Sequence, residues 1–291
     1  MITETSNPPF SPELHGPIRA DALVLENRIE SAVNRRLRLD VPGWPGFGPG
    51  QFAMLSPGAQ SGVLRSDPLL PRPMAIYRSF ESEQSPEFGG VEILYRVSGR
   101  GTGLLSEACV GDRVGFVGPL GRGFPPQGEG ERAILVAGGT GIASIYELAA
   151  RFAGGAKDGD SPVTVLFGAR SATELMGFDD FLALEGIEVR TATEDGSLGQ
   201  RGLVTELLES ALREPGKVRV YACGPTPMMR RAALVCRSRA TPCLVSLENN
   251  MACGFGVCLG CASPLTEGGF GLVCRDGPVF DAERVDWDGL P

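Results

Sequence analysis

The sequence predicts an α+β protein of several domains: an antiparallel β-barrel, an α/β domain with a parallel sheet, and a small cysteine-rich C-terminal segment. Its 291 residues suit two domains and a small third piece. Near residue 131 the hydrophobic pattern changes, from short strands separated by Gly/Pro-rich turns to strands that alternate with helices. Four of the eight cysteines lie within 22 residues near the C-terminus. These two observations divide the chain into the barrel, the α/β domain and the cysteine-rich segment.

Composition narrows the function classes. Glycine (41) and proline (23) are abundant, but 42% hydrophobic residues are enough for folded cores. A net charge of −8 argues against a general nucleic-acid binder, and no apolar run is long enough for a membrane span. The single histidine, His15, argues against mechanisms that need a histidine base or a histidine-ligated metal. No secretory signal precedes the first domain, so we expect a cytoplasmic protein with reduced thiols.

The first part of the chain is typical of a small antiparallel barrel. Residues 1–15 are polar and contain several prolines, and we expect a flexible leader there. The barrel is expected over residues 16–129, because short, imperfectly alternating strands are separated by turn residues. We predict strands at 20–29, 32–41, 51–56, 74–80, 91–97 and 113–117, and a short helix at 101–109.

The next part alternates strand and helix, which is the pattern of βαβ units on a parallel sheet. We place this α/β domain at residues 130–240 and the cysteine-rich segment at 241–291. The tail from 278 to 291 is short and acidic, and no element is predicted in it. The predicted strands are 133–137, 163–167, 187–192, 218–222 and 243–247, and the predicted helices are 141–152, 174–183, 203–212 and 226–236.

Cys253, Cys258, Cys261 and Cys274 have the spacing C-x4-C-x2-C-x12-C, which is the plant-type [2Fe–2S] pattern. Interspersed glycines allow the loop to curl so that thiolates converge and backbone N–H groups face the sulfur atoms. The alternative is a structural zinc site, although zinc usually takes two paired C-x-x-C units and only one is present. The other cysteines, Cys223 excepted, are expected to be packed thiols.

Two loops are candidates for nucleotide binding. Gly138, Gly139, Thr140 and Gly141 join a predicted strand to a helix, where free N–H groups and the helix dipole favour a pyrophosphate. The run Cys223–Gly224–Pro225 has the same position after another strand of the same sheet. Two such loops at the carboxyl edge of one sheet predict a nucleotide crevice. The alternative is that each is a tight connection without a ligand.

Arginines at two strand ends are further candidates. Arg72, followed by Pro73, could grip a diphosphate with two parallel hydrogen bonds, and Gly101 and Thr102 open a helix that offers N–H donors. The alternatives are a surface charge and an ordinary helix cap. Arg170, next to Ser171, follows the second strand of the α/β domain. It could meet a 2′-phosphate or be a solvated surface arginine, which leaves NAD and NADP both open.

These motifs follow one another in a recognisable order: R-P-M-A-I, Y-R-V, G-T-G, G-P-L-G-R-G-F, G-G-T-G, C-G-P-T-P-M and C-G-F-G-V-C-L-G-C…C-R-D-G-P-V-F. The chain resembles the ferredoxin–NADP reductase superfamily, and within it the electron-transfer subunits of NAD-linked (class 1B) dihydroorotate dehydrogenases. The resemblance covers about residues 16 to 285. It implies an FAD-binding barrel, an NAD-binding α/β domain and a terminal [2Fe–2S] segment.

The resemblance also implies roles for individual residues. The chain departs from the family pattern at two places: Ala75 stands where relatives usually carry Ser or Thr, and Asn249–Asn250 stands where they often carry a charged pair. No catalytic acid or base is implied, because hydride and electron transfer need positioning rather than proton chemistry. The implied residues are Arg72, Pro73, Met74, Ala75, Tyr95, Arg96, Val97, Gly101 and Thr102 for FAD; Gly138, Gly139, Thr140, Gly141, Cys223, Gly224 and Pro225 for NAD(H); and Cys253, Cys258, Cys261 and Cys274 for the cluster.

The function implied is electron transfer between a partner's flavin and NAD(H), through the cluster and FAD, during the oxidation of dihydroorotate to orotate in pyrimidine biosynthesis. The implied partner is an FMN-containing dihydroorotate dehydrogenase catalytic subunit, in a heterotetramer. One alternative keeps the cofactors and changes the complex, to an NADH-dependent ferredoxin–NADP reductase, a sulfide dehydrogenase or a hydrogenase. A second alternative is a zinc-stabilised binding module without a redox role.

Overall fold

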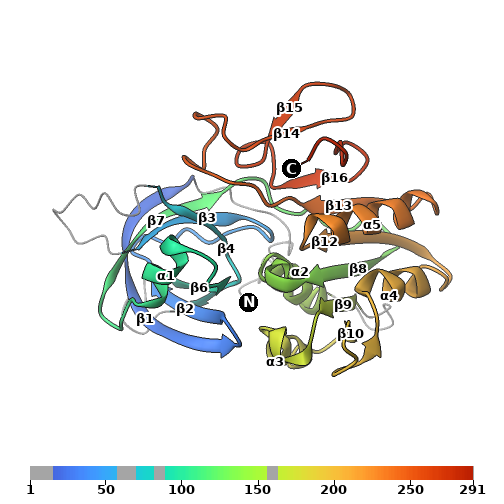
Figure 1. The fold of residues 1–291 in the computed structure, drawn as a ribbon, viewed down its shortest axis with the longest axis horizontal. Coiled ribbons are helices and arrows are strands. Elements are labelled where there is room, and N and C mark those ends of the chain that lie inside the picture. Colours follow the sequence, from blue (N-terminus) through green and yellow to red (C-terminus); the bar gives the residue numbers. More distant parts are fainter. Residues whose placement is uncertain (1–15, 58–69, 82–88, 156–162, 291) are drawn as a thin grey trace, which may run out of the picture.

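The structure is a computed structural model that describes residues 16–57, 70–81, 89–155 and 163–290. The leader predicted at 1–15 lies outside the described residues. Figure 1 shows two sheets side by side, with the C-terminal segment lying along one end of both. The antiparallel sheet comes first in the chain and the largely parallel sheet second, which confirms the predicted fold class.

The first sheet has seven antiparallel strands in the order β4-β3-β7-β1-β2-β6-β5. Its edge strands are separated by only two residues, Ile76 and Tyr77, so the sheet curls back on itself into a partly closed barrel. Ile76 N–H donates to Gln51 O (3.1 Å) and Tyr77 N–H donates to Glu92 O (2.9 Å), which links the two edges. The strand predicted at 74–80 is therefore two strands. The elements are β1 (Ile18–Ser31), β2 (Asn34–Asp40), β3 (Phe52–Pro57), β4 (Arg72–Ala75), β5 (Arg78–Glu81), β6 (Gly89–Arg96), α1 (Arg100–Ser106) and β7 (Arg113–Leu120).

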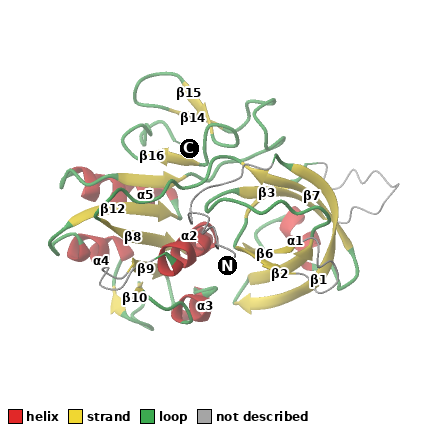
Figure 2. Ribbon diagram, turned by 180° about the vertical axis from the view of Figure 1, so that it is seen from behind, coloured by secondary structure: helices red, strands yellow, loops and turns green. Residues whose placement is uncertain are grey.

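The second sheet has the strand order β11-β10-β9-β8-β12-β13-β16, and its neighbours run parallel except for β13 and β16. Side chains of its central strands alternate between two cores, one shared with α2 and α3 and the other with α4 and α5. In Figure 2 these helices gather around this sheet. The elements are β8 (Glu131–Gly138), η1 (Gly139–Gly141), α2 (Ile142–Gly154), β9 (Val163–Ala169), η2 (Ala172–Glu174), α3 (Phe178–Leu182), β10 (Ile187–Thr193), β11 (Gln200–Arg201), α4 (Val204–Ala211), β12 (Lys217–Cys223), α5 (Thr226–Arg237) and β13 (Cys243–Ser246).

The helix predicted at 174–183 is interrupted. Gly177 adopts a positive φ of 64° between η2 and α3, so helical hydrogen bonding cannot continue through it. A Cβ at this position would lie 2.7 Å from the hydroxyl oxygen of Tyr77. The extended backbone of Leu175 ends η2, and the glycine at 177 precedes α3 and lets it approach the curled sheet.

The C-terminal segment forms a hairpin of β14 (Ala262–Pro264) and β15 (Phe270–Leu272), and then β16 (Val279–Asp281) pairs with β13. The second sheet therefore takes strands from both sides of the domain boundary predicted at 240/241. Strands β14, β15 and β16 have three residues each, too few for an alternating pattern to show in the sequence. Cys261 and Cys274 are buried in one core with Phe52 and Met54 of β3, so the segment packs on both sheets.

An ion network joins the two sheets. Asp180 of α3 accepts hydrogen bonds from Arg36 of β2 (2.5 Å) and from the Tyr77 hydroxyl (2.9 Å). Arg36 also donates to Glu92 (2.6 Å) and Glu30 (2.7 Å). Loss of one partner would leave a buried charge unpaired, so the network holds α3 against the curled sheet in one arrangement.

Candidate functional site

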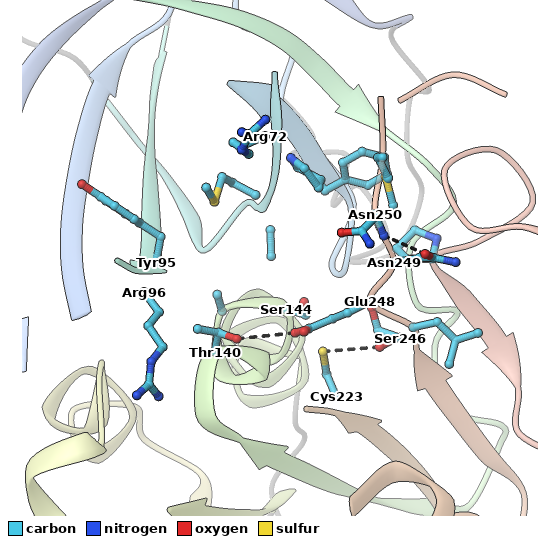
Figure 3. Close-up of a pocket in the computed structure, with 18 of the residues that line it drawn as sticks. Arg72, Tyr95, Arg96, Thr140, Ser144, Cys223, Ser246, Glu248, Asn249 and Asn250 are labelled. Atoms are coloured by element: carbon cyan, nitrogen blue, oxygen red, sulfur yellow. Dashed lines mark hydrogen bonds between the residues drawn. The ribbon is translucent and has the colours of Figure 1, made fainter. Parts of the chain in front are cut away.

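A cavity of about 620 Å³ lies between the two sheets (Figure 3). Strands β4 and β6 of the curled sheet form one side, and the ends of β12 and β13 form the other. Two predicted FAD residues are absent from its lining, since Val97 packs on the barrel core and Gly101 lies behind Arg72. The predicted site residues that line it are Arg72, Pro73, Met74, Ala75, Tyr95, Arg96, Thr102, Thr140 and Cys223.

Arg72 begins β4 at the edge of the curled sheet, where the following Pro73 is tolerated because an edge strand need not donate from every residue. One guanidinium nitrogen donates to Leu70 O at 2.8 Å. A Cβ at Gly101 would lie 2.4 Å from Arg72 Nε, so glycine there leaves room for the guanidinium. An arginine seated this way can present a planar fork to a diphosphate.

The hydroxyl groups of two predicted FAD residues, Thr102 and Tyr95, form hydrogen bonds within the curled sheet and its helix. Thr102 Oγ1 accepts the N–H groups of Ser98 (2.9 Å) and Gly99 (3.1 Å) and so caps α1. The buried Tyr95 hydroxyl donates to Asn27 Oδ1 at 3.2 Å, on β1. Both residues can therefore line the cavity with their side-chain surface and backbone groups, whereas their hydroxyl groups stabilise the barrel.

Small polar groups gather at the end of the cavity formed by the second sheet (Figure 3). The Cys223 thiol donates to Ser246 O at 3.6 Å, and the Thr140 hydroxyl donates to Glu248 Oε1 at 3.5 Å. Burial, with the nearby Glu248 carboxyl second, raises the pKa of Cys223 to about 12, so the thiol stays protonated. Burial also raises the pKa of Glu248.

Glu248 is a residue that the sequence reasoning missed. It follows β13 and lines the cavity beside Thr140, Ser144 and Cys223. The available signal was its position: an acidic residue directly after the last predicted strand, at the edge that carries the glycine loops. Together these residues place uncharged or weakly acidic hydrogen-bonding groups in the part of the cavity next to those loops.

A second cavity, of about 590 Å³, lies over the carboxyl ends of the parallel strands. Gly138, Gly139 and Pro225 line it, whereas Thr140 and Cys223 line the first cavity. The predicted nucleotide loops therefore stand between the two cavities. Arg96 lines both.

Gly141 and Gly224 line neither cavity, but they let the two loops pack together. A Cβ at Gly141 would lie 2.2 Å from the carbonyl oxygen of Cys223, and one at Gly224 would lie 2.9 Å from the carbonyl oxygen of Gly138. These neighbours are backbone atoms that cannot rotate away. The glycines thus set the separation of the strand ends where the cavities meet.

The four cysteines of the C-terminal segment form two pairs. Cys261 and Cys274 are buried, with sulfur atoms 3.2 Å apart. Cys253 pairs with the exposed Cys258. Burial acts to raise the pKa of Cys253, but hydrogen bonds from backbone N–H groups, including that of Phe255, lower it to about 6. The loop thus directs N–H groups at a thiolate.

This donor set fits a [2Fe–2S] cluster. Two bridged irons take two thiolates each, and two thiol pairs match that requirement. Gly254 and Gly256 both adopt φ of 86°, which gives the loop its curl.

Comparisons with known proteins agree with this architecture. The model of the family described as oxidoreductase NAD-binding domain matches residues 135–233, and that described as iron-sulfur cluster binding domain of dihydroorotate dehydrogenase B matches residues 248–286. The solved structure described as the NADH-dependent reduced ferredoxin-NADP oxidoreductase, studied for flavin-based electron bifurcation, is similar with a TM-score of 0.75. It is 28% identical and covers 92% of this chain and 91% of its own.

Curated relatives are more similar in sequence. The dihydroorotate dehydrogenase B (NAD(+)) electron transfer subunit of Bacillus caldolyticus is 36% identical over 272 residues, which are 92% of this chain and 96% of the relative. The protein of the same name from Geobacillus thermodenitrificans is 39% identical over 241 residues, which are 81% and 86% of the two chains.

The fold and the two glycine loops define a nicotinamide-dependent oxidoreductase of the ferredoxin-reductase type. The chain belongs to the family of dihydroorotate dehydrogenase B electron transfer subunits, because these relatives match it over nearly their whole length. The predicted family is confirmed.

Proposed function

We propose that this chain is the electron-transfer subunit of an NAD-linked dihydroorotate dehydrogenase, moving electrons between a partner's flavin and NAD(H) through a [2Fe–2S] cluster and FAD. One observation carries the proposal: the proposed nucleotide, FAD and cluster sites lie next to one another in the order in which electrons would pass through them. The glycine loops line both cavities, Arg96 is shared between them, and Met251 of the first cavity is two residues from Cys253. The chain therefore offers a short path from a nucleotide site to the cysteine segment.

The first cavity is the proposed FAD site. When bound, FAD would supply the conversion between a hydride, which carries two electrons, and single electrons. Arg72 would hold the diphosphate, and Pro73, Met74, Ala75, Tyr95, Arg96, Val97, Gly101 and Thr102 would shape its surroundings, directly or by packing. The protein's own contribution is positioning and exclusion of water, and no general base is required.

The glycine loops form the proposed NAD(H) site, which comprises Gly138, Gly139, Thr140, Gly141, Cys223, Gly224 and Pro225. Cys223 stays a neutral thiol and would lie near the nicotinamide. Cys253, Cys258, Cys261 and Cys274 would hold the cluster, with N–H groups of the loop offsetting its negative charge.

The proposed partner is an FMN-containing catalytic subunit, in a heterotetramer, and we propose a cytoplasmic location. Within the described ranges, no helix has the length and apolar character needed to cross a bilayer. The loop around Cys258 presents Phe255, Val257 and Leu259, which are 56%, 74% and 62% exposed. Three exposed apolar side chains beside a cluster ligand favour this loop as the contact with the partner, since single-electron transfer requires close approach.

Replacing Val257 by glutamate is expected to weaken association with the catalytic subunit roughly tenfold or more, because a charge would have to be desolvated at the contact. NADH-dependent dye reduction by the isolated chain provides an independent check that the variant is intact. The matched control is Val110→Glu, at a 72% exposed valine in the turn before β7. Calorimetric titration of the two subunits measures the effect, and equal affinities for both variants would contradict the contact.

Replacing Arg72 by alanine is expected to lower FAD affinity roughly tenfold to a hundredfold, because it removes charge-assisted hydrogen bonds to a diphosphate. Flavin retained after gel filtration, and the FAD concentration needed to restore absorbance, measure the change. Arg113→Ala is the control, since Arg113 is an exposed arginine on β7 whose guanidinium donates to Asp21 O. Unchanged flavin retention in Arg72→Ala would remove Arg72 from the site.

A second function keeps the cofactors but changes the complex, to an NADH-dependent ferredoxin–NADP reductase. The solved structure with a TM-score of 0.75 favours it, although the curated relatives are closer in sequence. The test is to purify the native complex and to assay dihydroorotate-dependent reduction of NAD⁺. Activity supports the proposed function, whereas its absence with the cognate catalytic chain present would favour the second.

A further inference from the structure

The surroundings of Arg170 bear on its two predicted alternatives, a contact with a 2′-phosphate or a solvated surface arginine. Arg170 follows β9 and lines the second cavity. Its guanidinium makes a two-point ion pair with Glu174, with Nε 3.1 Å from Oε2 and one terminal nitrogen 2.5 Å from Oε1. The planar fork that would grip a phosphate already holds a carboxylate.

Glu174 is itself held in place. Its backbone carbonyl accepts a hydrogen bond from the Asn34 side chain at 3.3 Å, and Arg96 lies 3.9 Å from its carboxylate. Asn34 and Arg96 belong to the curled sheet, so the pair with Arg170 is anchored from across the domain boundary. Glu194, after β10, also lines this cavity and adds a second negative charge.

We infer that Glu174, by occupying the Arg170 guanidinium, makes the cavity select a nicotinamide dinucleotide with a free ribose 2′-hydroxyl over one with a 2′-phosphate. A neutral hydroxyl can donate to a carboxylate at this edge, which is where parallel sheets bind the adenosine ribose. A 2′-phosphate would instead meet two carboxylates and an arginine without a free fork. The inference rests on the proposed function, since it assumes that this cavity binds the dinucleotide.

The test is the Glu174→Gln variant, which keeps the side-chain shape and removes the charge. We expect the ratio of kcat/KM for NADPH to that for NADH, in flavin-dependent dye reduction, to rise roughly tenfold or more, because Arg170 becomes free to bind phosphate. Calorimetric Kd values for NADP⁺ and NAD⁺ on the purified holoprotein should shift in the same ratio. Glu267→Gln is the matched control, because it removes the same charge from an exposed ion pair, with Arg284, in the C-terminal segment.

The double variant Arg170→Ala/Glu174→Gln separates release of the arginine from simple loss of repulsion. The inference requires that the double variant loses most of the gain for NADPH. A ratio that stays within twofold of wild type in Glu174→Gln, or a gain that persists without Arg170, overturns it. Failure of the proposed function looks different, because wild-type protein would then use neither NADH nor NADPH.

Discussion

Replacing Cys258 by serine is expected to abolish the cluster and to lower electron delivery to the catalytic partner roughly 100-fold or more, because losing a direct ligand costs more than losing a residue that only hydrogen-bonds to a ligand. NADH-dependent reduction of an artificial dye should largely survive, since the FAD and nucleotide cavities are lined by other residues. Cys258 is exposed and packs little, so the variant should fold. Visible absorbance and paired assays with dye and partner measure the two activities.

Cys109→Ser is the control for this experiment, because Cys109 is also exposed and lies outside the four-cysteine segment. It should retain the cluster and both activities. If Cys258→Ser lost dye reduction and partner reduction equally, the cluster and the flavin site would not be separable, and the proposed order of the three sites would be wrong.

Replacing Gly141 by alanine is expected to have the second largest effect. The new Cβ would lie 2.2 Å from the Cys223 carbonyl oxygen and 2.6 Å from the Gly224 nitrogen, so the two nucleotide loops must separate. A displacement of about 1 Å at a reacting pair costs roughly 10²-fold in rate, and we expect NADH-dependent dye reduction to fall by that order.

The flavin should remain bound to Gly141→Ala, because the proposed diphosphate contact is Arg72 on the other sheet. Stopped-flow reduction of the bound flavin by NADH isolates the affected step. Gly154→Ala is the matched control, at the other end of α2, where a Cβ meets nothing within 4 Å. A Gly141→Ala protein with the normal rate of flavin reduction would show that the loop contact is unimportant.

Much of the fold could be predicted from local patterns. Strands such as β8 and β12 contain short apolar runs, at 133–137 and 220–223, and the helices between the strands show one apolar face, so their order indicated a parallel sheet. The cysteine spacing likewise depends only on nearby residues. Such features need no knowledge of distant contacts, and they placed the glycine loops at one sheet edge.

Other features depend on partners far apart in the chain. The Arg36–Asp180 contact joins residues 144 apart, and nothing local in either segment indicates it. β16 exists because it pairs with β13, and its own three residues carry no pattern. In the sequence Glu248 cannot be told from an ordinary surface glutamate, because only the folded strand ends bring it beside Thr140 and Cys223. The same holds for Glu174, whose importance comes from Arg170 and from the curled sheet.

Elemental and flavin analysis of anaerobically purified protein decides whether this chain joins a flavin to a [2Fe–2S] cluster. We expect about two irons and two acid-labile sulfides per chain, together with one FAD. Protein that contains zinc in place of iron, or no labile sulfide, would contradict it.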